Sequence, residues 1–279
     1  MDAFQDKVVI VTGGASGIGR ALCVELARRG AQVVAADLNA AGASQVAAAI
    51  VASGGKAEAR AVDVASWEAV DALVGGVAAA HGRIDYVFNN AGIGVAGEER
   101  DVTLADWQRV LAVNLWGVVH GVRAAYPRML QQGFGHIVNT ASLAGLSPAP
   151  LQTSYVASKH AVVGLSCALR VEAADRGVRV SVVCPGLIDT PILHTIEVRG
   201  MDAERLRGLV TTTAKAMSPA ACARVILRGV EKNKPIIVVT RAAYVVWLLT
   251  RLSPRAALWV WRTAFLARIQ RELAAPAPS

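Results

Sequence analysis

The feature that most constrains the fold is a regular alternation of short apolar runs with longer segments of helical periodicity. Strand followed by helix, repeated along the chain, predicts parallel strands joined by crossover helices that cover both faces of one sheet. The expected strands are 8–12, 32–37, 57–62, 86–89, 136–140, 179–184 and 235–239, and the expected helices are 19–29, 43–52, 67–81, 104–130, 152–175 and one that begins at Ser218 and Pro219.

Length and composition agree with this architecture. The chain has 279 residues, of which 54% are hydrophobic but only 5% aromatic, a balance that suits a parallel sheet buried under helices. A chain of this length commonly forms one domain. We therefore expect an α/β fold with a Rossmann-type, doubly wound, parallel seven-stranded sheet in one domain over 1–240. A lid over the site is expected at about 188–217, and a helical C-terminal extension at 241–279.

The formal net charge of +8 is concentrated at the end of the chain. From Arg241 onward six arginines stand against one acid, Glu272, so this segment contributes +5 of the +8. The rest of the chain has no nucleic-acid recognition motif with interleaved basic residues, and we expect no nucleic-acid partner. The first residues lack a basic region followed by a long apolar run, which predicts a cytoplasmic protein. The four cysteines lie far apart without a CxxC pair, so neither a metal nor a disulfide is expected.

A glycine-rich loop follows the first strand and leads directly into a helix. Its glycines are spaced Gly13-x3-Gly17-x-Gly19, with Ser16 and Ile18 beside them. Such glycines permit a tight turn, let backbone N–H groups approach a pyrophosphate and place it at the positive end of the helix dipole. The spacing departs from the standard GxGxxG, and loop glycines alone are weak evidence because turns need them. We interpret these five residues as dinucleotide-binding.

Asp37 ends the second strand about 20 residues beyond the loop, where a carboxylate accepts hydrogen bonds from the adenosine ribose diol. A 2′-phosphate would be repelled there. The neighbours Leu38, Asn39 and Ser16 offer no cation, so NAD is expected rather than NADP. The alternative is a solvated aspartate in a turn, which this position disfavours.

Further motifs follow at the ends of later strands and within the helices. With them the chain resembles the short-chain dehydrogenase/reductase family over nearly all of 7–239. The motifs that carry the resemblance are 12–19, Asp63, Asn89-Asn90-Ala91-Gly92, Asn114, Ser142, Tyr155-x3-Lys159 and Pro185-Gly186.

Tyr155 and Lys159 share one face of their predicted helix because four residues separate them. A free tyrosine has a pKa of about 10 and is a poor base at neutral pH, but an adjacent cation lowers that pKa by favouring phenolate. Tyr155 is thus expected to transfer a proton. Two surface residues on an amphipathic helix would show the same spacing, and it is the remaining motifs that favour catalysis.

Ser142 follows the fifth strand, and its hydroxyl could hydrogen-bond a substrate oxygen. Thr140 is the rival hydroxyl, since strand alternation points it the same way. The family spacing favours Ser142. The resemblance implies that Asn114 holds a water linking Lys159 to solvent; an ordinary buried polar bond is the alternative.

The resemblance also implies the remaining cofactor contacts. Tyr155 and Lys159 are included among them. The others are Asp63 and Val64 at the adenine, Asn90, Ala91 and Gly92 at the floor of the cofactor cleft, and Pro185, Gly186, Ile188 and Thr190 around the nicotinamide.

Together these features predict an oxidoreductase that moves a hydride between NAD and a secondary alcohol or ketone. Its substrate is expected to be lipophilic (steroid-like, retinoid-like or fatty), although arginines in the lid leave hydroxy acids open. The alternatives are an NADPH-dependent 3-oxoacyl reductase of the carrier-protein type and a non-catalytic dinucleotide-binding protein. The expected substrate-facing side chains are Val95, Leu143, Leu146, Leu187, Ile192, Leu193 and, as a polar contact, His194.

The extension beyond 240 is apolar, rich in tryptophan and basic. Leu258, Trp261, Phe265 and Ile269 recur at helical spacing, but no run approaches the roughly 20 apolar residues of a membrane span. A subunit interface or a flap over an apolar pocket is the preferred interpretation. A membrane surface is the alternative, because a basic amphipathic helix with tryptophans suits one. We expect a homodimer or homotetramer.

Overall fold

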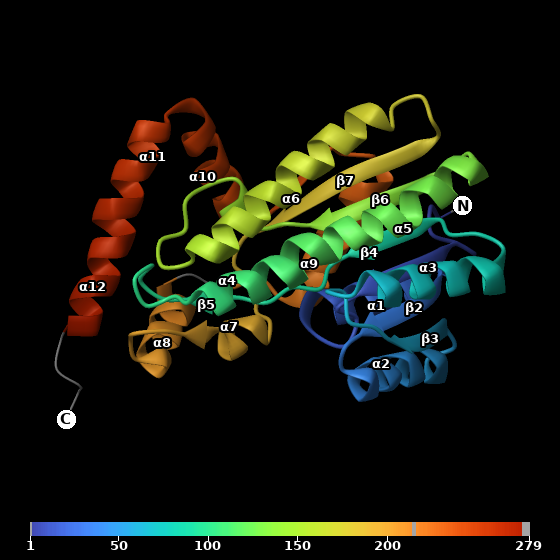
Figure 1. Ribbon diagram of the computed structural model, residues 1–279, viewed down its shortest axis with the longest axis horizontal. Coiled ribbons are helices and arrows are strands. Elements are labelled where there is room, and N and C mark those ends of the chain that lie inside the picture. The colour runs from blue at the N-terminus through green and yellow to red at the C-terminus, as the bar shows by residue number, and fades with distance from the viewer. Residues whose placement is uncertain (1, 214–215, 275–279) are drawn as a thin grey trace.

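One sheet of seven parallel strands organises the structure, a computed structural model that describes residues 2–213 and 216–274. The strand order is β3-β2-β1-β4-β6-β7-β9 (Figure 1). Residues 214–215 of the expected lid and 275–279 of the expected extension lie outside the described residues. The strands are β1 Val8–Thr12, β2 Gln32–Asp37, β3 Lys56–Ala61, β4 Tyr86–Asn89, β6 Gly135–Thr140, β7 Val178–Pro185 and β9 Ile236–Val239.

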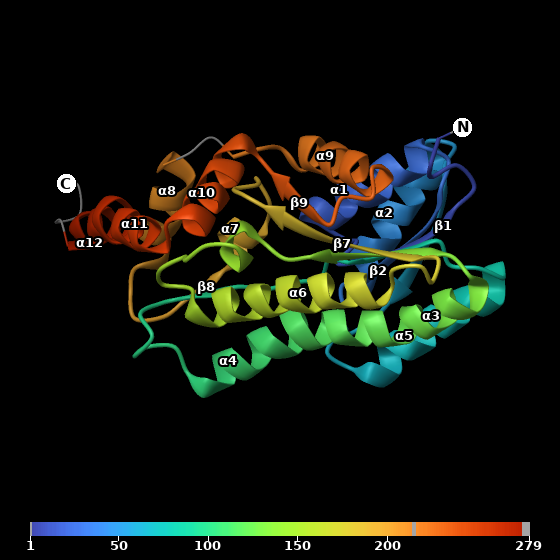
Figure 2. The same ribbon diagram turned by 90° about the horizontal axis from the view of Figure 1, so that it is seen from above.

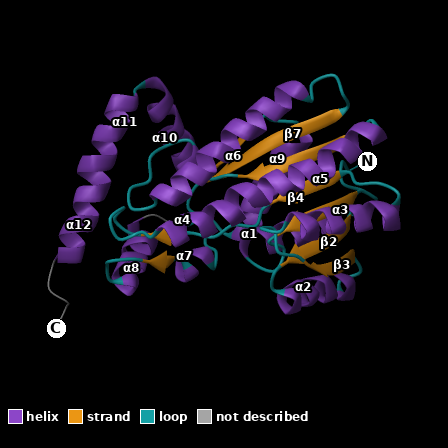
Figure 3. Cartoon of the chain, in the orientation of Figure 1, coloured by secondary structure: helices purple, strands orange, loops and turns teal. Residues whose placement is uncertain are grey.

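Helices cover both faces of this sheet (Figures 2 and 3). One layer holds α1 Gly17–Arg28, α2 Ala40–Ala52 and α9 Pro219–Glu231, and the other holds α3 Trp67–His81, α5 Gly117–Gln132 and α6 Thr153–Glu172. Helix α4 Leu104–Leu111 lies at the start of α5. The chain therefore has the predicted doubly wound, Rossmann-type fold.

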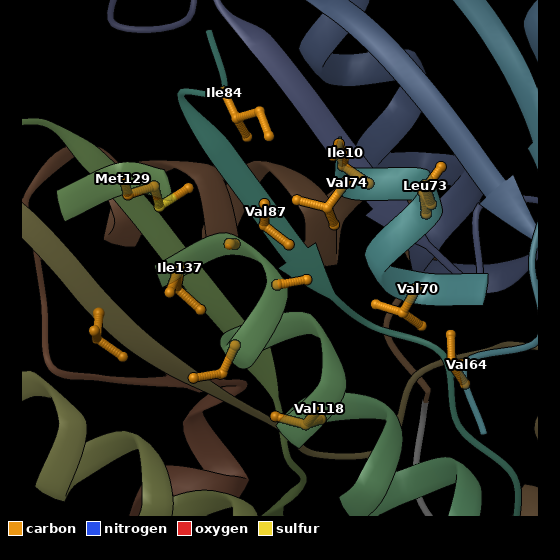
Figure 4. Close-up of a cluster of buried hydrophobic side chains, with 14 of the residues drawn as sticks. Ile10, Val64, Val70, Leu73, Val74, Ile84, Val87, Val118, Met129 and Ile137 are labelled. Carbon is orange, nitrogen blue, oxygen red and sulfur yellow. The ribbon is translucent and has the colours of Figure 1, made fainter. Parts of the chain in front are cut away.

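Two apolar cores lie on opposite faces of the sheet because side chains alternate along each strand. Val8 and Ile10 of β1 pack in one core with residues of α3 and α5, part of which Figure 4 shows. Val9 and Val11 enter the other core with Leu22 of α1. Burying each such side chain stabilises the fold by roughly 1.5–3 kcal/mol. Because all seven strands run parallel, their carboxyl ends lie at one common edge of the sheet.

The predicted helix over 104–130 is divided in two. A π-helical turn, η1 Ala112–Trp116, separates α4 from α5. Asn114 lies at its centre and is fully buried. Its side chain bonds to the backbone of Ile93, which fixes the turn. Apolar periodicity does not reveal one extra residue in a turn, so the sequence pattern is read as a continuous helix.

The segment between β7 and α9 contains short elements that the sequence pattern does not show. They are α7 Ile192–Thr195, β8 Glu197–Val198 and α8 Ala203–Thr213, and β8 pairs with β5 Val95–Ala96. An ion-pair network holds β8 to α4. Arg199 bonds Asp106 at 2.7 Å and Glu197 at 2.6 Å, and Arg109 reaches Glu197 at 2.8 Å. Hydrogen bonds from Arg199 and Thr103 hold the pKa of Asp106 well below its usual range.

The C-terminal extension is helical, as predicted. It comprises α10 Arg241–Leu252, α11 Pro254–Val260, the π-helical turn η3 Trp261–Leu266 and α12 Ala267–Ala274. Ser253 caps α11 by accepting from the Ala256 N–H at 3.4 Å, with Pro254 at the first helical position. These helices form the red end of the molecule in Figure 1, beside α8. In the described part of the chain, no helix is both long and apolar enough to cross a bilayer.

Candidate active site

A cavity of about 790 Å³ opens at the carboxyl edge of the sheet. The loops after β1, β2, β4, β6 and β7 contribute to its lining, and the lid and extension close its other side. Ligands of open α/β sheets bind at this edge, where the strand order reverses. Here the reversal is at β1, which pairs with both β2 and β4.

The loop after β1 is shaped for close approach of a backbone to a ligand. Gly13 and Gly17 have φ values of +68° and +52°, conformations that favour glycine. A Cβ on Gly13 would lie 2.9 Å from the Ala91 Cα. One on Gly19 would lie 1.9 Å from the Gly13 carbonyl oxygen. Gly13 and Gly17 line the cavity, whereas Gly19 packs behind the loop. Gly19 shapes the turn, and its expected contact with the cofactor stays a prediction.

The Asp37 carboxylate lines the cavity at the end of β2. It accepts hydrogen bonds from the backbone N–H groups of Ala15 at 3.0 Å and Asn39 at 2.9 Å. These bonds fix the carboxylate between the glycine loop and the start of α2. The adjacent lining residues are Ser16, Leu38 and Asn39, so an anionic group stands here among neutral side chains.

Helix α6 brings Tyr155 and Lys159 into the cavity on one face. The Lys159 Nζ lies 5.6 Å from the centre of the Tyr155 ring and donates to the Thr140 carbonyl oxygen at 3.0 Å. Ser142, just after β6, lines the cavity with Tyr155 and is near enough to lower the pKa of its phenol against the effect of burial. The Thr140 hydroxyl instead points to Asn90 at 3.5 Å. This arrangement agrees with Ser142 rather than Thr140 as the partner of the phenol, and the catalytic role of Ser142 stays a prediction.

Burial dominates the electrostatics of this group. Burial raises the pKa of Tyr155, and the nearby Ser142 hydroxyl acts in the opposite direction. Burial lowers the pKa of Lys159 to about 8, because a buried ammonium loses its hydration. The expected lowering of the Tyr155 pKa by Lys159 is therefore not found. The Lys159 Nζ instead lies over the Tyr155 ring and donates its hydrogen bond to the Thr140 backbone carbonyl.

Asn114 is positioned beside Lys159 but does not line the cavity. Its Oδ1 accepts from the Ile93 N–H at 2.9 Å, and its Nδ2 donates to the Ile93 carbonyl and to the Ser158 hydroxyl. A Cβ on Gly92 would meet both Asn114 Oδ1 at 3.2 Å and Lys159 Nζ at 3.5 Å. Both polar groups thus lie close to Gly92. The water-holding role of Asn114 stays a prediction.

The other predicted cofactor residues converge on the same cavity from the carboxyl ends of four strands, β1, β3, β4 and β7. They are Ser16, Ile18, Asp63, Val64, Asn90, Ala91, Gly92, Pro185, Gly186, Ile188 and Thr190. Of the predicted substrate-facing residues, Leu143, Leu187, Ile192 and Leu193 line the cavity, whereas Val95, Leu146 and His194 do not.

Sequence reasoning missed part of the apolar wall, although it considered the lid arginines, of which Arg207 lines the cavity. Ile196 and Leu206 of the lid line the cavity, and so do Trp261, Phe265 and Ile269 of the extension. The recurrence of the last three at helical spacing was the available signal, and it suggested a flap without fixing where it docks. Their docking follows from contact between α12 and α8, which brings Ile269 against Leu206.

The cavity's donors and acceptors fit a dinucleotide. The glycine loop would hold the pyrophosphate, Asp37 the adenosine ribose, and the residues after β7 the nicotinamide. Within the described part of the chain, no three His, Cys, Asp or Glu side chains are grouped to hold a metal ion.

Comparison with known proteins decides the family. The profile of the family described as short chain dehydrogenase matches residues 7–199. The chain belongs to this family. The cyclohexanol dehydrogenase of Acinetobacter sp. is 40% identical to it over 195 residues, which cover 70% of the chain and 78% of that protein.

Two further proteins are similar to this short-chain dehydrogenase over nearly its whole length. The probable oxidoreductase EphD of Mycobacterium tuberculosis is 41% identical over 261 residues, 91% of this chain and 44% of EphD. The chain therefore spans less than half the length of that relative. A short-chain dehydrogenase/reductase from Burkholderia phymatum, crystallised with NAD, superposes with a TM-score of 0.83 and 29% identity, covering 100% of both chains.

Proposed function

We propose that this short-chain dehydrogenase is an NAD-dependent oxidoreductase acting on a secondary alcohol or its ketone. The observation that carries the proposal is the convergence of Ser142, Tyr155 and Lys159 in a cavity that also holds the glycine loop and Asp37. A protein that only senses a dinucleotide has no use for a proton-transferring tyrosine. The names of two similar proteins, an NAD-bound family structure and a cyclohexanol dehydrogenase, agree with this chemistry.

Proton transfer is the part of the reaction that the chain itself performs. When bound, the nicotinamide supplies the hydride acceptor or donor. As phenolate, Tyr155 takes the proton from the substrate hydroxyl in oxidation, and as phenol it gives a proton to the substrate oxygen in reduction. The Ser142 hydroxyl donates a hydrogen bond that holds the substrate oxygen near the phenol. The buried Lys159 ammonium favours phenolate once its Nζ turns from the Thr140 carbonyl toward the site.

Asp37 supports NAD over NADP. Its carboxylate is fixed by two backbone N–H groups and would repel a 2′-phosphate. Among the described residues that line the cavity, the cations are Lys159 and Arg207. Lys159 lies at the reacting centre and Arg207 in the lid, so neither stands beside Asp37. The NADPH-dependent carrier-protein reductase is disfavoured for this reason.

A lipophilic substrate is supported by the wall opposite the nicotinamide loops. Trp261 and Phe265 pack edge to face with centroids 4.9 Å apart, and both line the cavity together with Ile269. Leu206 and Ile196 complete this wall from the lid. A sugar would leave its hydroxyl groups unpaired against such side chains. A ring or an acyl chain would instead bury apolar surface there.

The test is turnover by the full chain with NAD and with NADP over a panel of secondary alcohols graded in size and polarity. Absorbance of the reduced nicotinamide is the readout, with Tyr155→Phe as the blank. We expect NAD-linked oxidation of lipophilic alcohols and a weaker NAD preference in Asp37→Ser. A preference for NADP in the parent protein, or no turnover with any alcohol or ketone despite tight NADH binding, would contradict the proposal.

A further inference from the structure

The C-terminal helices present a second apolar face, directed away from the cavity. On α10 the exposed fractions of Tyr244, Val245, Leu248 and Leu252 are 49%, 65%, 36% and 81%. These positions recur at helical spacing, so they share one side of the helix. Packing against the lid does not use them. The inward side of the extension instead buries Ala243, Ala257 and Ile269.

The following helix also exposes apolar side chains. Leu258 and Trp259 of α11 are 58% and 66% exposed. Trp261, two residues on, points inward and lines the cavity. Of these two neighbouring tryptophans, Trp261 thus belongs to the cavity wall and Trp259 to the surface. A large, exposed tryptophan beside exposed leucines marks an interaction site.

Arginines stand on the same side as these apolar residues. Arg241 and Arg251 share the helical side of Leu248, and Arg255 and Arg262 share that of Leu258. All four are exposed, and the Arg251 guanidinium lies 5.9 Å from the centre of the Trp247 ring. No Asp or Glu occurs between Arg241 and Arg271. The outer face, defined by these residues, combines apolar side chains with cations alone.

We propose that the outer face docks on an anionic lipid surface. Tryptophan and leucine enter the boundary between headgroups and acyl chains, and arginines pair with lipid phosphates. A second copy of this chain fits less well, because a two-fold interface would bring together two copies of a face whose charged residues are all cations. Docking places the wall formed by Trp261 and Phe265 next to the lipid, where lipophilic substrates concentrate.

Vesicle binding by the full chain tests this directly. The protein is sedimented with vesicles of phosphatidylcholine alone and of phosphatidylcholine mixed with phosphatidylglycerol, at low and high salt. We expect binding to the mixed vesicles and its weakening by salt. Arg251→Glu/Arg255→Glu is expected to weaken binding by about 30-fold or more. The matched control is Arg176→Glu/Arg224→Glu, two exposed arginines elsewhere, and it should bind like the parent protein.

Fluorescence locates the contact. Acyl chains that carry bromine quench tryptophans that reach them, so mixed brominated vesicles should quench the parent protein. Trp259→Phe is expected to remove a large part of that quenching. Trp116→Phe is not, although Trp116 is also 55% exposed, because it lies in η1 away from the extension.

Several outcomes would overturn the docking proposal. These are absence of binding to anionic vesicles at low salt, equal weakening in the control pair, or unchanged quenching in Trp259→Phe. A sedimentation velocity measurement without lipid adds another. If Leu258→Ser separates an oligomer into monomers, the outer face is an interface between copies of the chain. None of these readouts involves turnover, so they are independent of the proposed reaction.

Discussion

At the scale of single residues, the proposed chemistry depends on one hydroxyl next to another. The Ser142 hydroxyl lies near the Tyr155 phenol and lowers its pKa against the effect of burial, and Tyr155 is the only tyrosine among the described residues that line the cavity. We predict that Tyr155→Phe lowers kcat by about 10²–10⁴-fold, the usual contribution of a positioned proton-transfer group. Steady-state kinetics with the best alcohol of the panel measures it. Tyr126→Phe, a partly buried tyrosine on α5, is the control, and equal turnover in both variants would exclude Tyr155 as the acid or base.

His136 gives a pH dependence of stability that is unrelated to catalysis. Burial, with Arg179 and Arg170 nearby, lowers the pKa of His136 to about 3, and its Nε2 lies 2.9 Å from the Ser181 hydroxyl. The unfolded chain therefore binds one more proton than the folded chain between about pH 6.5 and 3, so stability falls as pH falls through this window.

The prediction for His136 concerns how steeply the free energy of unfolding changes with pH, and not its absolute value. Urea unfolding between pH 6 and pH 4 should show the parent protein losing up to about 1.4 kcal/mol per pH unit more than His136→Gln. His160→Gln, at an exposed position on α6, should keep the parental slope. Parallel pH profiles for the parent and His136→Gln would show that His136 keeps an ordinary pKa in the fold.

At the scale of elements, the lid is held by charge rather than by strand pairing. The β5–β8 pair is two residues long on each side, whereas Arg199 joins Asp106 and Glu197 through hydrogen bonds of 2.6–3.0 Å. The Asp106 side chain is 5% exposed. Removing Arg199 leaves that carboxylate with Thr103 and Arg109, so part of its pairing survives.

We predict that Arg199→Met lowers the free energy of unfolding by about 1–3 kcal/mol, the usual loss for a hydrogen bond to a buried charge, and raises KM more than it lowers kcat. The reason is that the lid forms part of the substrate wall but not of the reacting centre. Arg100→Met removes an arginine that is 78% exposed and should change stability by less than about 0.5 kcal/mol. A kcat loss without a KM change in Arg199→Met would contradict this division.

At the scale of the whole molecule, the sequence predicts the elements that follow a periodic pattern of residues. It does not predict features that depend on contacts between residues far apart in the chain. The seven strands were predictable from the alternation of short apolar runs with helical segments. The site residues were predictable because they lie at strand ends or share one face of a helix. The π-helical turn at Asn114 depends on a bond to the Ile93 backbone, and the place of the extension depends on Ile269 meeting Leu206. Neither contact leaves a local pattern. The interaction of Lys159 with Thr140 is likewise visible only in three dimensions.

The extension links this whole-molecule arrangement to substrate choice. Trp261 and Phe265 come from beyond the last strand yet line the cavity, so they are predicted to set the size of substrate accepted. Trp261→Ala should lower kcat/KM for alcohols that fill the wall by about 10–200-fold, the range for lost apolar contacts in a pocket, while bulkier alcohols lose less. Leu258→Ala, on the same helices but 58% exposed, is the matched variant. Of these two side chains, only that of Trp261 lines the cavity. If both variants lower kcat/KM equally for every alcohol, the extension acts on the stability of the fold and not on the substrate.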